Sequence, residues 1–224
     1  MSISENVRLV QQNMKQAHEK KTDQKKQVQL IGVTKSVSSE VAAELLAAGV
    51  TALGENRPEG LTDKQAALGR DVCEWHFIGT LQTRKVRQVI DQIDVLHSLD
   101  RLHLAEEINK RAKRPVDCFV QVNVSGEESK QGIEPADLHS FLHEVGQYPM
   151  VRVIGLMTMA PLTEDTDTIR SVFQSLRQLR DEVAVRHLPY APCTELSMGM
   201  SSDYEIAIEE GATYVRVGTV LVQP

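Results

Sequence analysis

The sequence has little cysteine and no long run of apolar residues. Its three cysteines, Cys73, Cys118 and Cys193, are far apart and odd in number. That pattern excludes a disulfide framework and a Cys-x-x-Cys metal site, and it is typical of a reducing compartment. No run of about 18 apolar residues occurs, and the polar N-terminus has no signal-peptide core, so no membrane-spanning segment is expected. We therefore predict a cytoplasmic protein.

Several common site motifs are absent as well. The chain has a net charge of −6, and its basic stretch KKTDQKK at 20–26 is short, so nucleic acid is not an expected partner. No GxGxxG follows the first strand-like segment, which disfavours a dinucleotide site. The chain has no GxSxG motif, no Cys/His nucleophile pattern and no metal-ligand spacing of His, Cys, Asp and Glu. No metal site is therefore predicted.

What the chain does have is a regular alternation of strand-like and helix-like segments. Eight short segments have the composition of buried strands, and they cover 27–35, 51–56, 73–79, 94–99, 116–124, 151–159, 194–198 and 213–220. Apolar residues at helical spacing separate most of them, most weakly over 57–68, and a further helix is predicted over about 3–21. This favours one α/β domain, 1–224, folded as a (β/α)8 TIM barrel with an extra N-terminal helix. An open doubly wound sheet is the alternative.

Functional groups of such barrels lie where the strands end. The residues at the predicted strand ends are Lys35, Asn56, Gly79, Asn123, Met157, Ser197, Gly218 and Thr219. Lys35 is notable because it ends the first strand, in LIGVTKSVS, without a glycine or proline stop. It is either an ordinary solvated lysine or an amine placed for chemistry.

Two loops near the end of the chain are rich in small and hydroxyl-bearing residues. In SMGMSSDYE at 197–205, Ser202 and Glu205 have capping-box spacing at the start of a predicted helix, whose free N–H groups favour an anion. In VRVGT, Gly218 permits close backbone approach and Thr219 supplies a hydroxyl. Barrels often bind phosphate at loops seven and eight, so these segments form either a phosphate site or plain helix caps.

Arg216 is predicted to point into the barrel. Strand alternation places Val215 and Val217 on the face that packs against the outer helices, and Arg216 on the opposite face. A guanidinium in the interior must be paired or must donate to a ligand. An ion pair with an inward acid such as Glu195 is the competing explanation.

Other polar residues also belong to the predicted barrel mouth. Gln121 and Asn123 share a strand face, and His76 either lines the mouth or packs as a satisfied core residue. A lysine amine, a phosphate cradle and an inward arginine in one mouth match the needs of pyridoxal phosphate. That cofactor requires an amine for its aldehyde, a cradle for its phosphate and a partner for its ring nitrogen.

The order of the motifs along nearly the whole chain resembles that of the pyridoxal-phosphate homeostasis proteins, a family of single-domain barrels related to the N-terminal domain of alanine racemase. The matching motifs are GVTKSVS, GEN, WHFIGTLQTRK, SLDR, VQVNVSGEESKQGI, IGLMTM and LSMGMSSDYEIAIEEGATYVRVGT. Two departures stand out. Thr80 occupies a position that is usually proline, and the sequence ends at Pro224, where relatives usually continue with a short FG and arginine segment.

The resemblance implies that pyridoxal 5'-phosphate is the cofactor and that Lys35 forms a Schiff base with it. It also implies that Arg216 faces the pyridine nitrogen. The residues that it implies around the phosphate are Ser197, Ser201, Gly218 and Thr219, and those that it implies along the pocket are Asn56, His76 and Met157.

The expected role is that of a carrier or regulator in intracellular pyridoxal-phosphate homeostasis, with no catalytic residues. An arginine cannot accept a proton, so it disfavours the protonated pyridinium that drives broad carbanion chemistry. Racemisation remains possible, but it needs acid/base groups on both faces of the substrate carbon, and no second domain is expected to help. Apo-enzymes are expected partners, and the chain is expected to be a monomer or weak dimer. The alternatives are a pyridoxal-phosphate-dependent amino-acid racemase and a phosphosugar-type aldolase that uses Lys35.

Overall fold

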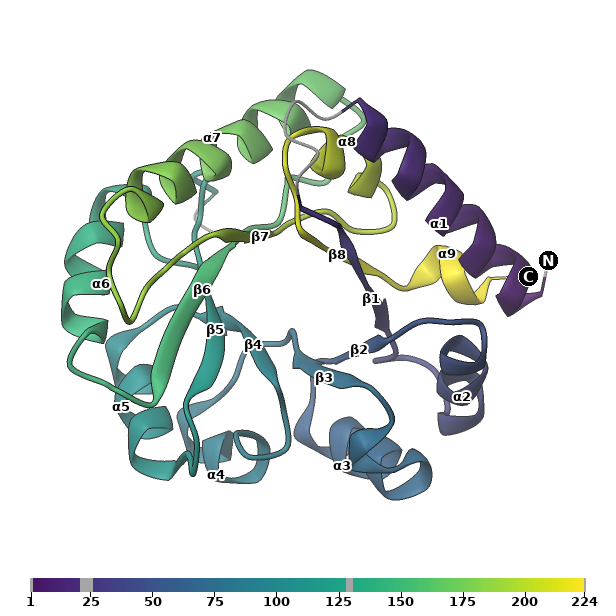
Figure 1. Cartoon of the computed structure of the whole chain (residues 1–224), viewed down its shortest axis with the longest axis horizontal. Helices are drawn as coiled ribbons and strands as arrows, with labels where there is room; N and C mark the ends of the chain where they lie inside the picture. The colour runs from purple at the N-terminus through teal and green to yellow at the C-terminus, as the bar shows by residue number, and fades with distance from the viewer. Residues whose placement is uncertain (1, 21–25, 128–130, 224) are drawn as a thin grey trace.

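The chain folds into a closed barrel of eight parallel strands surrounded by helices (Figure 1). The computed structural model describes residues 2–20, 26–127 and 131–223, so most of the basic stretch 20–26 lies outside the described residues. Each strand pairs with the next along the chain, and β8 closes the barrel against β1. The strands are β1 (Gln29–Val33), β2 (Ala52–Glu55), β3 (Glu74–Phe77), β4 (Val95–Leu99), β5 (Val116–Gln121), β6 (Val151–Met157), β7 (Glu195–Ser197) and β8 (Tyr214–Val217).

Helices connect the strands and cover the outside of the barrel. They are α1 (Ile3–Glu19), α2 (Ser39–Ala47), α3 (Pro58–Leu68), α4 (Val86–Val89), α5 (Leu102–Arg111), α6 (Leu138–Val145), α7 (Thr166–Ala184), α8 (Tyr204–Glu209) and α9 (Thr219–Val222). Short 3-10 turns lie at η1 (Arg70–Val72), η2 (Thr83–Lys85) and η3 (Pro135–Asp137). The predicted TIM barrel with an extra N-terminal helix is therefore confirmed.

The N-terminal helix α1 packs beside α8 and α9 and holds the last turn of the chain in place (Figure 1). Ser2 and Glu5 form a capping box at its start, in which each side chain accepts a hydrogen bond from the other residue's backbone N–H. The amide of Asn6, which is buried, donates to the backbone oxygens of Leu221 and Gln223 at 3.2 and 2.7 Å. Both ends of the described chain are thus fixed beside the last βα loop.

Two apolar layers build the core. The larger one lies between the strands and the helices, where both the valine face of β8 and the apolar stripe of α7 are buried. A small second cluster fills part of the barrel interior and consists of Val95, Phe119, Ile154 and Met157. Strands buried on both sides are rich in Val, Ile and Leu, as parallel sheets require.

The predicted elements are all present, but several end earlier than the sequence pattern indicates. Each strand of the barrel lies inside its predicted range, because residues at the ends of those ranges belong to the loops before and after the strands. Thr219 was expected within strand eight and instead starts α9, directly after the strand ends at Val217. The weak helical pattern over 57–68 does form α3, which has the favourable Pro58 in its first turn.

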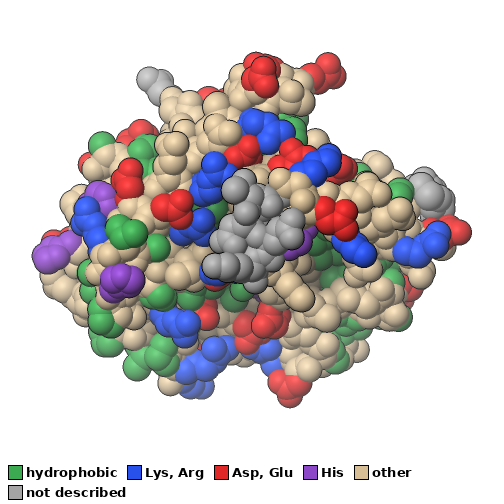
Figure 2. Space-filling view, turned by 45° about the horizontal axis from the view of Figure 1, so that its top comes forward, with side chains coloured by type: hydrophobic (Ala, Val, Ile, Leu, Met, Phe, Trp, Pro, Cys, Tyr) green, Lys and Arg blue, Asp and Glu red, His purple; other side chains and the backbone are tan. Residues whose placement is uncertain are grey.

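Charged side chains are mixed on the molecular surface. On the face drawn in Figure 2, Lys and Arg side chains are interspersed with Asp and Glu. All three cysteines are free thiols, and burial raises the pKa of each. In the described part of the chain, no helix combines the length and the apolar character needed to cross a bilayer.

A buried ion pair joins α3 to Glu55, the last residue of β2. Lys64 Nζ lies 3.0 Å from Glu55 Oε1, and their side chains are only 8% and 1% exposed. The same oxygen accepts a hydrogen bond from the Thr34 hydroxyl at 2.5 Å. Because Thr34 directly precedes Lys35, this pair fixes the backbone from which the lysine side chain projects.

We expect the substitution Lys64→Met to lower the free energy of unfolding by about 3–5 kcal/mol, because it leaves a buried carboxylate unpaired. Urea denaturation measures this loss. The matched control is Lys85→Met, since Lys85 Nζ lies at a similar 2.9 Å from Glu59 Oε1 but that carboxylate is 65% exposed. Its midpoint should stay at the wild-type value. Equal effects of the two substitutions would contradict the structural role of the buried pair.

Candidate functional site

The largest described cavity lies at the rim where the strands end. Its volume is about 750 Å³. The residues that line it are Val33, Lys35, Ser36, Asn56, Ile78, Gly79, Thr80, Gln121, Gln131, Met157, Met159, Met200, Ser201, Ser202, Arg216, Gly218, Thr219, Val220 and Val222. The predicted site residues that this cavity brings together are Lys35, Asn56, Met157, Ser201, Arg216, Gly218 and Thr219.

Lys35 lies in the loop between β1 and α2, at the edge of the cavity. Its side chain is exposed, and no hydrogen bond or ion pair within the described residues engages its amine. By contrast, the nearby Lys64 is held by Glu55 in the buried pair. Lys35 therefore brings an unengaged amine to the edge of the cavity.

The loops after β7 and β8 meet at one side of the cavity. The Gly218 N–H donates to the Ser201 hydroxyl at 3.3 Å, and Thr219 follows at the start of α9. Gly199 has a φ of +94°, which suits glycine, and a Cβ there would lie 2.6 Å from the Cβ of Ala207. The two loops thus bring the hydroxyls of Ser201 and Thr219 to the same wall of the cavity.

The capping box expected between Ser202 and Glu205 is wrong. The helix α8 begins later, at Tyr204, and its N-cap residue is Asp203, which makes no side-chain capping bond. The Asp203 carboxylate instead accepts the backbone N–H of Met200 at 2.6 Å, within the preceding turn. Ser202 is left to line the cavity.

Arg216 points into the barrel, as strand alternation predicted, and it is only 5% exposed. Its Nη1 donates to the Ser197 hydroxyl at 2.5 Å, and its Nη2 donates to the Thr158 carbonyl at 3.0 Å. The competing expectation of an ion pair with Glu195 is wrong, because Glu195 pairs with Lys26 instead. Burial lowers the pKa of Arg216 to about 10, so the guanidinium remains a cation at neutral pH.

Ser197 and His76 lie beneath the cavity and are absent from its lining. Both side chains are fully buried. His97, a residue that sequence reasoning missed, connects them through hydrogen bonds of 2.8 Å from its two ring nitrogens. Burial, together with the nearby Arg216 cation, holds the pKa of His97 well below its usual value. The sequence could have identified His97, because side-chain alternation within the predicted strand 94–99 directs it into the barrel.

The opposite side of the cavity is formed by the ends of β2, β3 and β5. Gly79 packs directly on Asn56, so that a Cβ at residue 79 would lie 2.3 Å from the Asn56 backbone oxygen. The hydroxyl of Thr80 donates to the side-chain oxygen of Gln131 at 2.5 Å. Gln121 lines the cavity as expected, whereas the amide of Asn123 donates to the backbone of the following loop.

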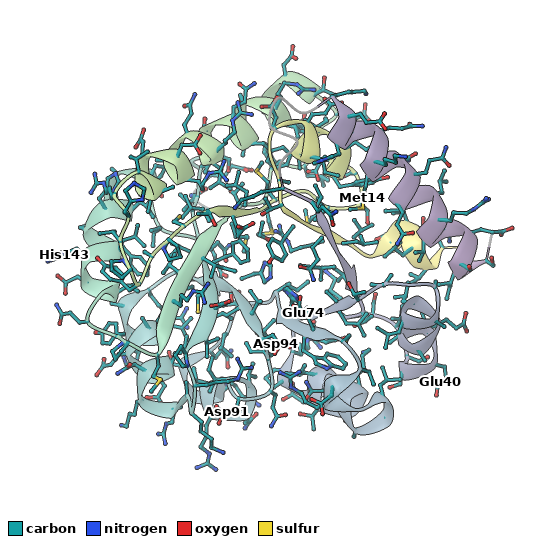
Figure 3. All side chains as sticks on the ribbon, in the orientation of Figure 1. Met14, Glu40, Glu74, Asp91, Asp94 and His143 are labelled. Atoms are coloured by element: carbon teal, nitrogen blue, oxygen red, sulfur yellow. The ribbon has the colours of Figure 1, made fainter. Side chains whose placement is uncertain are left out.

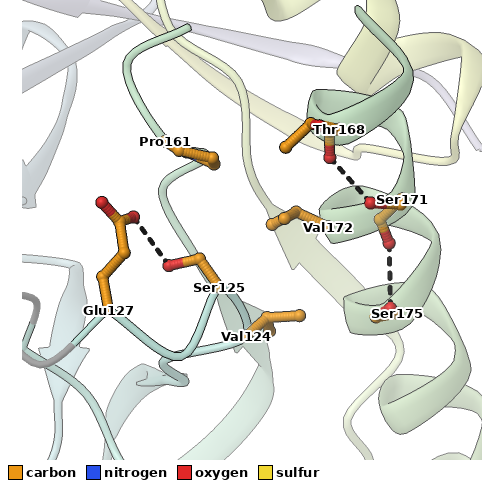
Figure 4. Close-up of a pocket in the computed structure, with 8 residues that line it drawn as sticks. All are labelled: Val124, Ser125, Glu127, Pro161, Thr168, Ser171, Val172 and Ser175. Carbon is orange, nitrogen blue, oxygen red and sulfur yellow. Dashed lines mark hydrogen bonds between the residues drawn. The ribbon is translucent and has the colours of Figure 1, made fainter. Parts of the chain in front are cut away.

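A second pocket, of about 270 Å³, lies between the segment after β5 and the helix α7 (Figure 4). Two of its hydroxyls, those of Ser171 and Ser175, donate to helix carbonyls one turn earlier. A third, that of Ser125, donates to Glu127. Its polar groups are thus engaged locally, so the rim cavity is the candidate site. Among the residues described, no group of three His, Cys, Asp or Glu side chains is arranged to hold a metal.

Comparison with known proteins agrees with this architecture. The model of the alanine racemase N-terminal domain family matches residues 5–223. The pyridoxal phosphate homeostasis protein of Aquifex aeolicus is 42% identical over 99% of this chain and 97% of its own length. The protein of the same name from Pseudomonas aeruginosa is 35% identical, over 98% of this chain and 94% of its own.

Solved structures lead to the same group of proteins. The structure of PipY from Synechococcus elongatus with pyridoxal phosphate bound is 33% identical, has a TM-score of 0.86 and covers 99% of this chain and 100% of that one. Alanine racemase from Corynebacterium glutamicum shares the fold at 16% identity and a TM-score of 0.72, and the match spans 59% of its length. The chain therefore belongs to the alanine racemase N-terminal domain family, within the group of pyridoxal phosphate homeostasis proteins.

Proposed function

We propose that this protein binds pyridoxal 5'-phosphate in the rim cavity, as a Schiff base on Lys35, and serves as a carrier or regulator of the cofactor. One observation carries the proposal. An unengaged lysine amine, two hydroxyl-bearing loops and a buried guanidinium all line the same cavity. These are the groups that an aldehyde, a phosphate and a pyridine nitrogen require of a protein.

The residues present fit the cofactor. A volume of about 750 Å³ is within the usual range of small-molecule sites. The wall made by Ser201, Gly218 and Thr219 offers hydroxyl donors for a phosphate. Asn56 and Met157 supply a polar and an apolar contact along the sides. In this proposal Ser197 and His76 act from beneath the cavity, through Arg216, rather than by touching the phosphate or ring.

Each chain residue then has a distinct task. When bound, pyridoxal phosphate supplies an aldehyde carbon that reacts with amines and a ring that withdraws electrons. Lys35 holds the cofactor covalently through its Nζ. Ser201 and Thr219 donate to the phosphate, and Arg216 donates an N–H toward the ring nitrogen. The buried pair of Lys64 and Glu55 fixes the loop from which Lys35 extends.

The guanidinium of Arg216 favours holding the cofactor over broad catalysis. It can donate but not accept a proton, so the ring nitrogen next to it stays unprotonated and withdraws electrons weakly. The exposure of Lys35 leaves the reacting bond open to water, which weakens electrostatic stabilisation of a carbanion. An open, reversible attachment suits transfer to apo-enzymes, and we propose these as partners of a cytoplasmic monomer or weak dimer. Amino-acid racemisation is the second candidate, since the family model describes an alanine racemase domain.

We expect borohydride reduction of the protein loaded with pyridoxal phosphate to label the peptide that contains Lys35. Peptide mass spectrometry identifies the labelled residue. Lys35→Ala should remove both the label and the visible absorbance band of the bound cofactor. Lys85→Met is the control and should leave both unchanged, because Lys85 lies outside the cavity lining. A label on another lysine, or a full band in Lys35→Ala, would contradict this role.

We expect Thr219→Val and Ser201→Ala to weaken binding of pyridoxal phosphate about ten- to a hundredfold. Each removes a charge-assisted hydrogen bond worth about 1.5–3 kcal/mol. Binding of unphosphorylated pyridoxal should stay nearly unchanged, and calorimetric titration of both ligands measures the difference. A matched control is Thr80→Val, since its hydroxyl lines the same cavity but donates to Gln131. Equal losses for both ligands would show that Ser201 and Thr219 do not contact the phosphate.

Turnover separates a carrier from a racemase. The loaded protein is incubated with L-alanine in deuterated water, and NMR follows exchange of the α-proton while chiral chromatography follows the product. A parallel assay mixes it with an apo-enzyme and follows transfer of the cofactor. We expect transfer without racemisation at ordinary enzyme rates, roughly 1 per second or more. Racemisation at such rates would replace the carrier proposal with the racemase.

A further inference from the structure

A continuous row of polar side chains crosses the barrel interior beneath the cavity. It starts at Arg216, whose Nη1 lies 2.5 Å from the Ser197 hydroxyl. The hydroxyl lies 2.8 Å from His97 Nδ1, and His97 Nε2 lies 2.8 Å from His76 Nδ1. His76 Nε2 lies 3.5 Å from the carboxylate of Glu74. The row thus runs from the cavity to the opposite, amino-terminal end of the strands, where Glu74 begins β3.

At the cavity end of the row, the direction of the hydrogen bond between Ser197 and His97 is not fixed. The guanidinium of Arg216 can only donate, so the Ser197 oxygen accepts from it. The hydroxyl then donates its own proton to His97 Nδ1, or it accepts a second hydrogen bond from that nitrogen. The contacts at this end permit either direction.

The other end of the row decides between the two directions. Glu74 forms the far terminus and lies toward the middle of the barrel in the axial view of Figure 3. Its carboxylate can only accept, and the same oxygen already accepts from the Gln29 amide at 2.6 Å. His76 Nε2 is buried and makes no hydrogen bond in the described structure, and the Glu74 carboxylate lies 3.5 Å from it. A proton on that nitrogen faces the carboxylate favourably, whereas a lone pair there would face a negative charge.

Aromatic rings surround the two imidazoles in the barrel interior. Both side chains are fully buried. The ring of Phe119 stacks on His97 at 4.6 Å between centroids, and the ring of Tyr214 lies 6.0 Å from that of His76. Burial in these surroundings, next to the Arg216 cation, holds the pKa of His97 well below its usual value. A neutral imidazole carries one proton, on Nδ1 or on Nε2, so with both rings neutral a single choice orders the whole row.

We propose that Glu74, His76, His97 and Ser197 form a one-directional hydrogen-bond chain that positions Arg216 for the ligand. In it each residue donates to the next, from Arg216 through Ser197 and His97 to His76, and the Nε2–H of His76 faces the Glu74 carboxylate at 3.5 Å. Both histidines carry their proton on Nε2. The Ser197 oxygen and the Thr158 carbonyl each accept one hydrogen bond from the guanidinium, which also lines the cavity and keeps further N–H groups for a ligand.

The first test reads the direction of the chain in protein without ligand and does not depend on the proposed function. Long-range 1H–15N NMR distinguishes ring nitrogens that carry a proton from those that carry a lone pair. Assignment uses spectra of His76→Gln and His97→Gln. We expect Nε2 to be protonated and Nδ1 to be unprotonated in both histidines at neutral pH. An Nδ1 proton on either ring, or a doubly protonated ring, would overturn the proposal.

The substitution Glu74→Gln tests whether the carboxylate sets the direction. An amide can donate as well as accept, so both directions become available and the nitrogen shifts of His76 and His97 should move toward averaged values. Asp117→Asn is the matched control, because it neutralises another acid at the same end of the barrel without touching the chain, and it should keep the wild-type shifts. Wild-type shifts in Glu74→Gln, or equal changes in the two variants, would contradict the role of Glu74.

The positioning of Arg216 itself rests on the proposed function and is tested with ligands. Binding of pyridoxal phosphate is compared with that of an analogue in which CH replaces the ring nitrogen. Ser197→Ala should lower the preference for the natural ring about tenfold, because the guanidinium loses its inner anchor. Ser201→Ala, on the phosphate wall, should weaken both ligands equally and keep the preference. An unchanged preference in Ser197→Ala would overturn the positioning role, whereas absence of binding to the wild type would refute the proposed function instead.

Discussion

The guanidinium of Arg216 is buried inside the barrel, and it constrains which side chains can surround it. Removing such a cation from water is costly unless hydrogen bonds replace the lost hydration. Within the described residues Arg216 has no acidic partner in an ion pair; it donates instead to Ser197 and to the carbonyl of Thr158. The barrel interior must therefore be polar on this side, and Ser197 in turn requires His97 as its neighbour. The apolar cluster around Phe119 occupies only the remaining space.

The same constraint shapes the cavity and the kind of ligand that suits it. A buried cation that makes no ion pair within the described residues attracts a neutral acceptor or an anion, which a pyridine nitrogen and a phosphate both provide. Parallel closure brings Lys35, at the end of β1, to the same rim as the loops after β7 and β8. In the proposed function the covalent anchor and the phosphate donors come from sequence-distant segments, whereas the buried residues that hold Arg216 lie below them.

Periodicity and strand-end logic predicted the barrel and the rim residues, because a parallel barrel directs every strand end to one face. Lys35 and Arg216 follow from that rule and from side-chain alternation alone. The rule does not predict how deeply a residue is buried. Ser197 and Ser201 are similar in sequence context, but Ser197 belongs to β7 and is buried, whereas Ser201 belongs to the loop and lines the cavity. The contact between His76 and His97 depends on the register between β3 and β4, which composition does not encode. The capping box expected between Ser202 and Glu205 is absent because α8 begins only at Tyr204, with Asp203 as its N-cap residue, and spacing alone does not locate that start.

The central claim is that one cavity holds the aldehyde, the phosphate and the ring nitrogen of pyridoxal phosphate on three separate groups of this chain. The most direct measurement is a crystal structure of the protein grown with the cofactor. The account predicts electron density continuous from Lys35 Nζ to the cofactor, the phosphate between Ser201 and Thr219, and an Arg216 nitrogen within hydrogen-bond distance of the pyridine nitrogen. Cofactor density elsewhere, or a ring nitrogen turned away from Arg216, would contradict it.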